Sequence, residues 1–121
     1  MTKKPNAKPY DLEERTFLFA KEVRIFTKTL PNTISNVEDG RQLVRASGSV
    51  GANYREANES LGKKDFLMRI KISRKEAKES AYWLRLIHET NKLKNDMDAQ
   101  HLMQEAIELT KILSSILEKS K

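Results

Sequence analysis

Residues 45–66 read RASGSVGANYREANESLGKKDF, and the interpretation of this stretch decides the fold. It contains three of the four glycines of the chain, and basic residues stand at both ends. Three interpretations compete: a loop that cradles a phosphate, a turn that presents a catalytic serine, and a helix with small side chains against which another helix packs. The choice among them decides whether the protein is an enzyme.

The glycine-rich segment 48–51 does not match the motifs of phosphate loops or catalytic serine turns. It lacks the Lys-Ser/Thr ending of a P-loop and the G-x-G-x-x-G spacing of a dinucleotide fold, and no strand pattern precedes it. Ser47 stands where a G-x-S-x-G turn needs its first glycine. Each glycine inside a helix costs about 1 kcal/mol relative to alanine, so a packing reason is required. We therefore expect a helix in which Gly48, Gly51 and Ala52 allow close approach of a neighbouring helix or subunit.

The rest of the chain has helical periodicity throughout, and no strand alternation competes with it. The predicted helices cover about residues 11–30, 36–61, 64–92 and 97–121. Short connections between them favour antiparallel neighbours. The fold class is therefore predicted to be all-α: an antiparallel up-down four-helix bundle forming a single domain over residues 11–121, after a flexible basic tail at residues 1–10.

Capping and periodicity give the expected helix ends and the expected core. Capping-box spacing marks two helix starts, Asp11 with Glu14 and Ser35 with Glu38. Pro31 and Gly62 are predicted to end the first and second helices. The inward positions are predicted to be Leu12, Phe19, Val23, Phe26, Leu30, Leu43, Ala46, Val50, Tyr54, Ala57, Leu61, Phe66, Ile70, Ser73, Ala77, Ala81, Leu84, Ile87, Leu102, Ala106, Leu109, Leu113 and Ile116.

Composition limits the protein class. The chain has 121 residues and no cysteine, which excludes disulfides and thiolate metal sites and favours a reducing compartment. No apolar run approaches the roughly 18 residues of a membrane span, and the N-terminal residues lack the apolar core of a secretory signal. We expect a cytoplasmic protein without a membrane partner.

No group of residues has the pattern of a catalytic or metal site. The two histidines, His88 and His101, fall on different predicted helices, and the sequence shows no acidic residue at a spacing that would match either of them in a catalytic site. His88 is expected to pack at the inner edge of its helix. We therefore predict no catalytic residues, no metal and no cofactor.

Three spaced blocks of sequence resemble the bacterial four-helix-bundle proteins encoded in 23S rRNA intervening sequences. The blocks are Arg45–Asn53 with Glu56-Ala57, then Asp65-Phe66 with Ile72, Lys75–Glu79 and Tyr82–Leu84, and, in the first helix, Asp11–Arg15, Phe19-Ala20, Val23-Arg24 and Leu30-Pro31. The likeness covers about residues 10–117. It implies a homopentameric ring and no catalysis. The chain is also similar, more distantly, to the accessory variability determinant proteins of diversity-generating retroelements, which work as basic pentamers beside a reverse transcriptase and RNA.

Two of the predicted helices carry apolar residues that one bundle cannot bury. A helix with two apolar sides needs a second partner, and aromatic and methionine side chains are enriched in interface cores. The alternative is that these residues cover loops or wrap the edge of the bundle. The predicted oligomer-interface residues are Met68, Ile72, Tyr82, Trp83 and Leu86 on the third helix and Leu18 and Ile25 on the first.

The net charge of +6 is concentrated in residues 61–95, which carry ten Lys/Arg and four Asp/Glu. Cations at helical spacing suit phosphate oxygens, with binding that depends on salt and little on sequence. The alternative is an ordinary charged outer face in which Glu76 or Glu79 pairs with some of the cations. The predicted nucleic-acid-binding residues are Lys71, Arg74, Lys75, Lys78 and Arg85 on the third helix and Lys21, Arg24 and Lys28 on the first.

These features favour a non-enzymatic homo-oligomer that binds structured RNA or another nucleic acid through a basic surface. The alternative is a protein-interaction scaffold, for example for a polymerase or reverse transcriptase, which uses the same exposed aromatic residues and has no direct nucleic-acid role.

Overall fold

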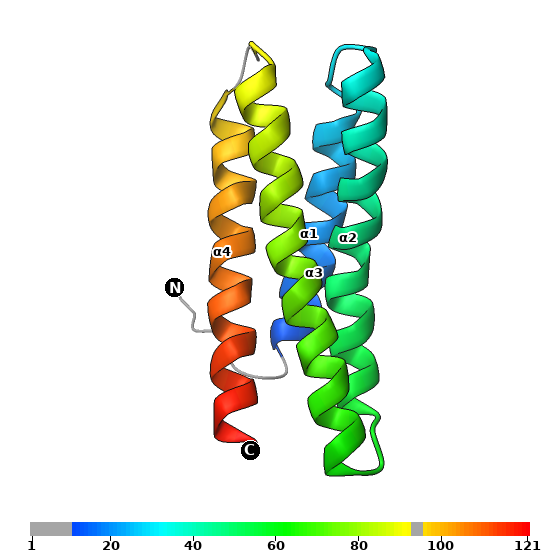
Figure 1. The fold of residues 1–121 in the computed structure, drawn as a ribbon, viewed down its shortest axis with the longest axis vertical. Coiled ribbons are helices and arrows are strands. Elements are labelled where there is room, and N and C mark those ends of the chain that lie inside the picture. Colours follow the sequence, from blue (N-terminus) through cyan, green and yellow to red (C-terminus); the bar gives the residue numbers. More distant parts are fainter. Residues whose placement is uncertain (1–10, 93–95) are drawn as a thin grey trace.

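In the computed structural model, which describes residues 11–92 and 96–121, the chain forms a bundle of four long helices (Figure 1). They are α1 (Asp11–Thr27), α2 (Ile34–Asn58), α3 (Lys63–Thr90) and α4 (Asp96–Lys119). The described residues contain no strand, so the all-α prediction is confirmed. The predicted tail at residues 1–10 lies outside the described residues.

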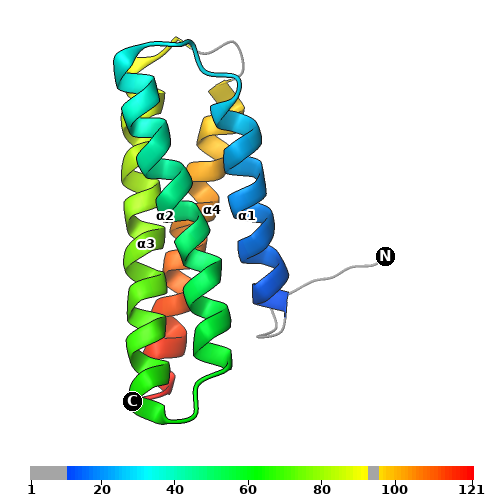
Figure 2. The ribbon, with the colours of Figure 1, turned by 90° about the vertical axis from the view of Figure 1, so that its right-hand side faces the viewer.

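The four helices pack in a closed order, in which α1 contacts α2 and α4, and α3 contacts α2 and α4. Helices α1 and α3 therefore occupy opposite corners of the bundle, as Figure 2 also shows. Hydrogen bonds join α2 to α3 and to Asn91, the residue that follows α3, in reverse order along the chain: Asn36 with Asn91, Arg45 with Glu76, and Asn53 with Arg69.

Helices α1 and α4 lie at the two ends of the described chain and are joined by a charged pair. Arg15 donates from Nε and Nη2 to the two carboxylate oxygens of Glu105, at 2.7 and 2.8 Å. The hydrogen bond with Glu105 raises the pKa of Arg15 above its ordinary value, although partial burial opposes the shift. This bidentate geometry fixes both helices in register more firmly than a single contact would.

The core is apolar and follows the predicted stripes, with one error at the end of α2. Most of the predicted inward residues are buried, while Leu30, Phe66, Ala81 and Ile116 are partly buried against the core. Leu61 was predicted to face inward but is fully exposed, because α2 ends at Asn58 and its periodicity does not extend that far. Gly62 does not end α2; it is the residue that precedes α3, with extended backbone.

The start of α2 also differs from the prediction. Thr33, not Ser35, is the capping residue, and its hydroxyl accepts a hydrogen bond from the backbone N–H of Asn36 at 3.1 Å. The Asn36 side chain is buried and donates to Pro31 O at 2.9 Å and to Asn91 Oδ1 at 2.8 Å, and Asn91 donates back to Asn36 Oδ1 at 2.8 Å. This amide pair ties the connection after α1 to the end of α3.

Among the glycines of the chain, Gly51 has the least room for a side chain, because α1 packs directly against it. A Cβ atom placed on Gly51 would lie 2.9 Å from Thr16 Oγ1 and 3.2 Å from Thr16 Cβ. A Cβ atom on Gly48 would instead meet the guanidinium of Arg24, at 3.0 Å from Nη2. Ala52 was predicted to share this role but is exposed. The glycine-rich part of the opening stretch, residues 45–58, is thus helical, with small residues on the side that α1 covers.

Candidate nucleic-acid interface

The outer side of α3 carries a row of cations around a shallow groove of about 320 Å³. We call Lys71, Arg74, Lys75 and Lys78 the α3 cation row. The three lysines are exposed and Arg74 is partly buried. Glu79 and Tyr82 also line the groove. Steps of three and four residues place successive Cβ atoms about 5–6 Å apart, so the row is nearly continuous.

The row lies outside because of the packing of α3. The buried residues of this helix include Ile70, Ser73 and Ala77, which face α2 and α4, and the Ser73 hydroxyl donates to Val50 O at 2.7 Å. With about 3.6 residues per turn, the positions one or two residues after these point away from the core. The same periodicity that buries the apolar stripe therefore exposes the lysines.

The two carboxylates nearest the row in sequence are engaged elsewhere. Arg45 on α2 donates from Nη1 to Glu76 at 3.3 and 3.4 Å and from Nη2 to Glu79 Oε1 at 2.9 Å. No member of the α3 cation row makes an ion pair within 4.0 Å with any residue that the structure describes. Glu76 and Glu79 therefore pair with Arg45 and not with the row, so that part of the alternative is wrong. An ordinary charged outer face stays the alternative to a binding site.

Arg85 is on the same helix but, unlike the α3 cation row, it makes an ion pair. Its Nε donates to Glu89 Oε2 at 2.9 Å, one turn further along the helix. The hydrogen bond with Glu89 raises the pKa of Arg85, and the same bond lowers the pKa of Glu89. Arg85 is exposed, so water and salt weaken the pair, but its charge is offset by a neighbour.

The predicted cations of α1 lie on a different side of the molecule. Lys21, Arg24 and Lys28 are all exposed. Arg24 donates to Ala20 O of its own helix at 2.9 Å and to Val44 O of α2 at 3.3 Å. Because α1 and α3 stand at opposite corners, the structure does not bring these residues together with the α3 cation row.

The predicted oligomer-interface residues divide into two groups. Those exposed on the surface are Met68, Tyr82, Leu18 and Ile25, and those partly buried are Ile72, Trp83 and Leu86. The sequence reasoning missed further exposed apolar residues, which are Phe17, Ile34, Val37, Met97 and Ile107. Two of them, Ile34 and Val37, lie in the first turn of α2.

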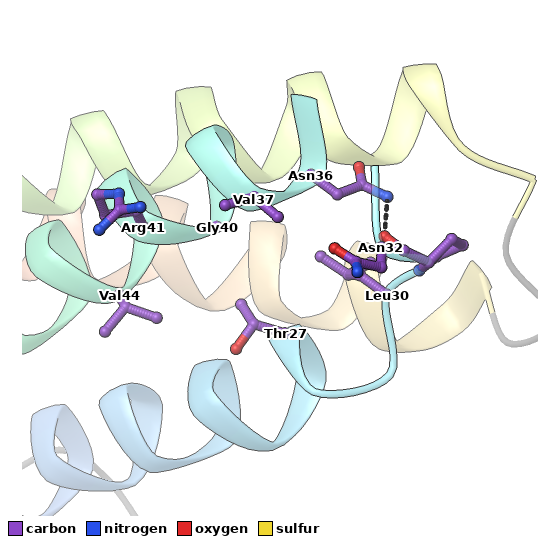
Figure 3. Close-up of a pocket in the computed structure, with 9 residues that line it drawn as sticks. Thr27, Leu30, Asn32, Asn36, Val37, Gly40, Arg41 and Val44 are labelled. Atoms are coloured by element: carbon purple, nitrogen blue, oxygen red, sulfur yellow. Dashed lines mark hydrogen bonds between the residues drawn. The ribbon is translucent and has the colours of Figure 1, made fainter. Parts of the chain in front are cut away.

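Val37 lies in a groove between the end of α1 and the start of α2 (Figure 3). Val37 and Val44 of α2 line it together with Thr27 of α1, and Figure 3 shows Thr27 and Val44 pointing into the space between the two helices. Arg41 is the one charged residue among those that line it. This groove is mainly apolar and offers one cation, so it suits phosphates less well than the α3 surface.

The serines of the glycine-rich stretch have no catalytic geometry. Ser47 is fully buried and its hydroxyl donates to Val44 O at 3.2 Å, and Ser49 Oγ accepts from Asn53 Nδ2 at 2.8 Å. Within residues 11–92 and 96–121, no three His, Cys, Asp or Glu side chains are grouped so that they could hold a metal ion. No helix in those ranges is long and apolar enough to cross a membrane.

The comparisons with known proteins agree with this architecture. A family model described as 23S rRNA-intervening sequence protein matches residues 9–115. The fold is similar to the crystal structure of a protein of unknown function from the S23 ribosomal protein family of Bacteroides thetaiotaomicron, with a TM-score of 0.76 and 28% sequence identity. That match covers 87% of this chain and 96% of the other. No curated protein matches the chain.

Proposed function

The chain belongs to the 23S rRNA-intervening sequence protein family, and on this premise we propose that it is a non-enzymatic protein that binds structured RNA. The α3 cation row holds the phosphate backbone. The observation that carries the proposal is that Lys71, Arg74, Lys75 and Lys78 share one groove while the adjacent carboxylates are bound to Arg45.

Such a surface predicts a particular kind of binding. Lysine and arginine contacts to phosphates release counterions, so the affinity falls as salt rises. Phosphate contacts position a nucleic acid without reading its bases. We therefore expect affinity for many RNA sequences, with preference governed by shape.

We further propose that the antiparallel up-down bundle assembles into a homopentameric ring. Exposed apolar residues at two opposite corners support this: Leu18 and Ile25 on α1, and Met68 on α3. Two different patches on opposite sides of a molecule suit head-to-tail contact, which closes into a ring when the rotation allows. Repetition of a weak phosphate site around a ring raises the avidity for one RNA molecule.

The RNA proposal is tested with a triple variant, Lys71→Gln, Arg74→Gln and Lys78→Gln. The matched control is Arg55→Gln, Lys111→Gln and Lys119→Gln, which removes the same charge from exposed positions on α2 and α4. Anisotropy of a labelled RNA hairpin should show weaker binding for the first variant only. The slope of log affinity against log salt should decrease in magnitude by about 2 to 3.

Equal losses of RNA affinity in both variants would mean that only net charge matters. An unchanged affinity in the first variant would contradict the RNA proposal and favour a protein-binding scaffold.

The ring is tested separately by light scattering at low and high salt. A mass near that of five chains supports it, and a change of Ile25 to Glu should lower that mass. A monomer at both salt concentrations would contradict the ring.

A further inference from the structure

Tyr82 is the one aromatic residue that lines the groove of the α3 cation row. It lies four residues after Lys78 and seven after Lys75, so the three side chains project from the same side of α3. Its side chain is 57% exposed. A large aromatic surface therefore stands in water at one end of a row of cations that make no ion pair with a described residue.

The orientation of this ring is restrained by its neighbour. Trp83 is partly buried and packs against the apolar core, and the Tyr82 and Trp83 ring centroids are 5.0 Å apart with the planes at 77°. Edge-to-face pairs of this kind are favourable for aromatic rings. Because Trp83 is anchored in the bundle, Tyr82 is presented to solvent with fewer available orientations than an isolated tyrosine.

A subunit contact is the competing use of Tyr82, and its surroundings argue against that use. Lysine is depleted in the cores of protein interfaces. A second copy seated on Tyr82 would also cover Lys75 and Lys78, which have no carboxylate partner among the described residues. A nucleic acid supplies both a phosphate for the cations and a flat base for the ring.

We propose that Tyr82 stacks on an unpaired base of the RNA whose phosphates lie on the α3 cation row. This inference rests on the proposed function and specifies its ligand: RNA with an unpaired nucleotide in a loop or bulge, in preference to a continuous duplex. Bases inside an A-form duplex are stacked on one another and their faces are closed to side chains, whereas loop bases are open. Aromatic stacking tolerates any base, because every base has a flat face.

The test uses two labelled RNAs with equal numbers of phosphates, a hairpin with an unpaired loop and a fully paired duplex. Three variants of the full chain are compared: Tyr82→Leu, Tyr82→Phe and, as a control, Phe17→Leu. Phe17 is also 57% exposed but lies on α1, at the opposite corner of the bundle. Each variant is also measured by light scattering.

We expect Tyr82→Leu to weaken hairpin binding about tenfold, the equivalent of one lost base stack, without changing duplex binding or the salt slope. Tyr82→Phe should bind like the original chain, since it keeps the ring, and Phe17→Leu should have no effect. A loss on both RNAs alike, no loss on either, or a lower mass for Tyr82→Leu would overturn the inference.

These failures are distinguishable from failure of the proposed function. If the Lys71, Arg74 and Lys78 triple variant loses affinity and salt dependence while Tyr82→Leu does not, only the stacking inference is wrong. If the triple variant binds like the original chain, the proposed function itself is wrong. Trp83 is the single tryptophan of the chain, so its fluorescence gives an independent signal of a base arriving at Tyr82.

Discussion

Arg45 on α2 holds the carboxylate of Glu76 on α3, with Nη1 lying 3.3 Å from Oε1. The two partners have very different surroundings, because the Arg45 side chain is 51% exposed and that of Glu76 only 9%. The same guanidinium reaches Glu79, which lines the groove of the α3 cation row. One residue of α2 therefore affects both the packing of α3 and the charge of its outer surface.

Replacing Arg45 by alanine should destabilise the protein and weaken RNA binding together. Glu76 would remain buried without its partner, which costs about 1–3 kcal/mol of unfolding free energy. Glu79 would become free to neutralise Lys75, four residues earlier on α3. Urea unfolding and RNA anisotropy measure the two effects.

The control for this change is Arg55→Ala, which removes an exposed cation of α2 that is remote from the pair. It should alter neither property by a comparable amount. A double variant that also replaces Glu76 by alanine should lose less stability than the two single changes added together. Strict additivity would show that the two side chains do not act as a pair.

The two glycines on the side of α2 that α1 covers should respond in opposite directions to alanine. At Gly51 the new methyl group would meet Thr16, which is fully buried and cannot move away, and overpacking of this kind costs about 1–3 kcal/mol. At Gly48 it would meet the end of the flexible Arg24 side chain, so the helix preference of alanine should add up to about 1 kcal/mol. Thermal and urea unfolding of both variants check this, and equal effects would contradict it.

Thr33→Ala should destabilise the protein and Ser35→Ala should not. The Thr33 hydroxyl satisfies a backbone N–H at the start of α2, and loss of such a cap costs about 1 kcal/mol. Ser35 is exposed within the first turn. Urea midpoints compare the two variants directly, and a larger loss for Ser35→Ala would show that the helix starts later.

Tyr54 should make the protein less stable at alkaline pH. Burial is the largest cause that raises the pKa of Tyr54 above its ordinary value, and a hydrogen bond with Asn58 opposes it. The folded state therefore disfavours the ionised phenol. The contribution of neutral Tyr54 to the free energy of unfolding is fully present below the pKa of about 10 of an unfolded tyrosine. It is lost as pH rises from there through the raised pKa of the folded state.

The measurement is urea unfolding of the original chain and of Tyr54→Phe at several pH values. The free energy of unfolding of the original chain, relative to that of the variant, should be constant near neutral pH and should fall above about pH 10. A constant difference throughout would show that Tyr54 ionises equally in the folded and unfolded states.

The sequence was sufficient for the fold because the helical stripes are long and unbroken. Leu43, Val50 and Tyr54 are buried as predicted, and the family resemblance is confirmed by the family model. Helix ends were less predictable. Ser35 with Glu38 has the spacing of a capping box, yet Thr33 caps α2. Either hydroxyl residue can accept a hydrogen bond from a backbone N–H at the start of a helix, so the sequence does not show which of the two is the cap.

The candidate site was predictable in part. Spacing alone places Lys71, Lys75 and Lys78 on one side of a helix. The partner of Glu79 could not be found in the same way, because Arg45 is 34 residues away in sequence and meets it only through the packing of α2 on α3. The separation of the α1 cations from the α3 cation row depends likewise on which helices are neighbours.

The bidentate pair of Arg15 and Glu105 joins positions 90 residues apart, whereas the other helix contacts connect elements that follow one another along the chain. Contacts between consecutive helices are local and form rapidly, which gives helical bundles their short folding times. The meeting of α1 with α4 requires the whole chain to be gathered and is therefore expected to be the last step of folding. By the same reasoning α1, the shortest helix, is the part whose amide hydrogens should exchange with solvent first in native conditions, while α2 and α3 stay protected.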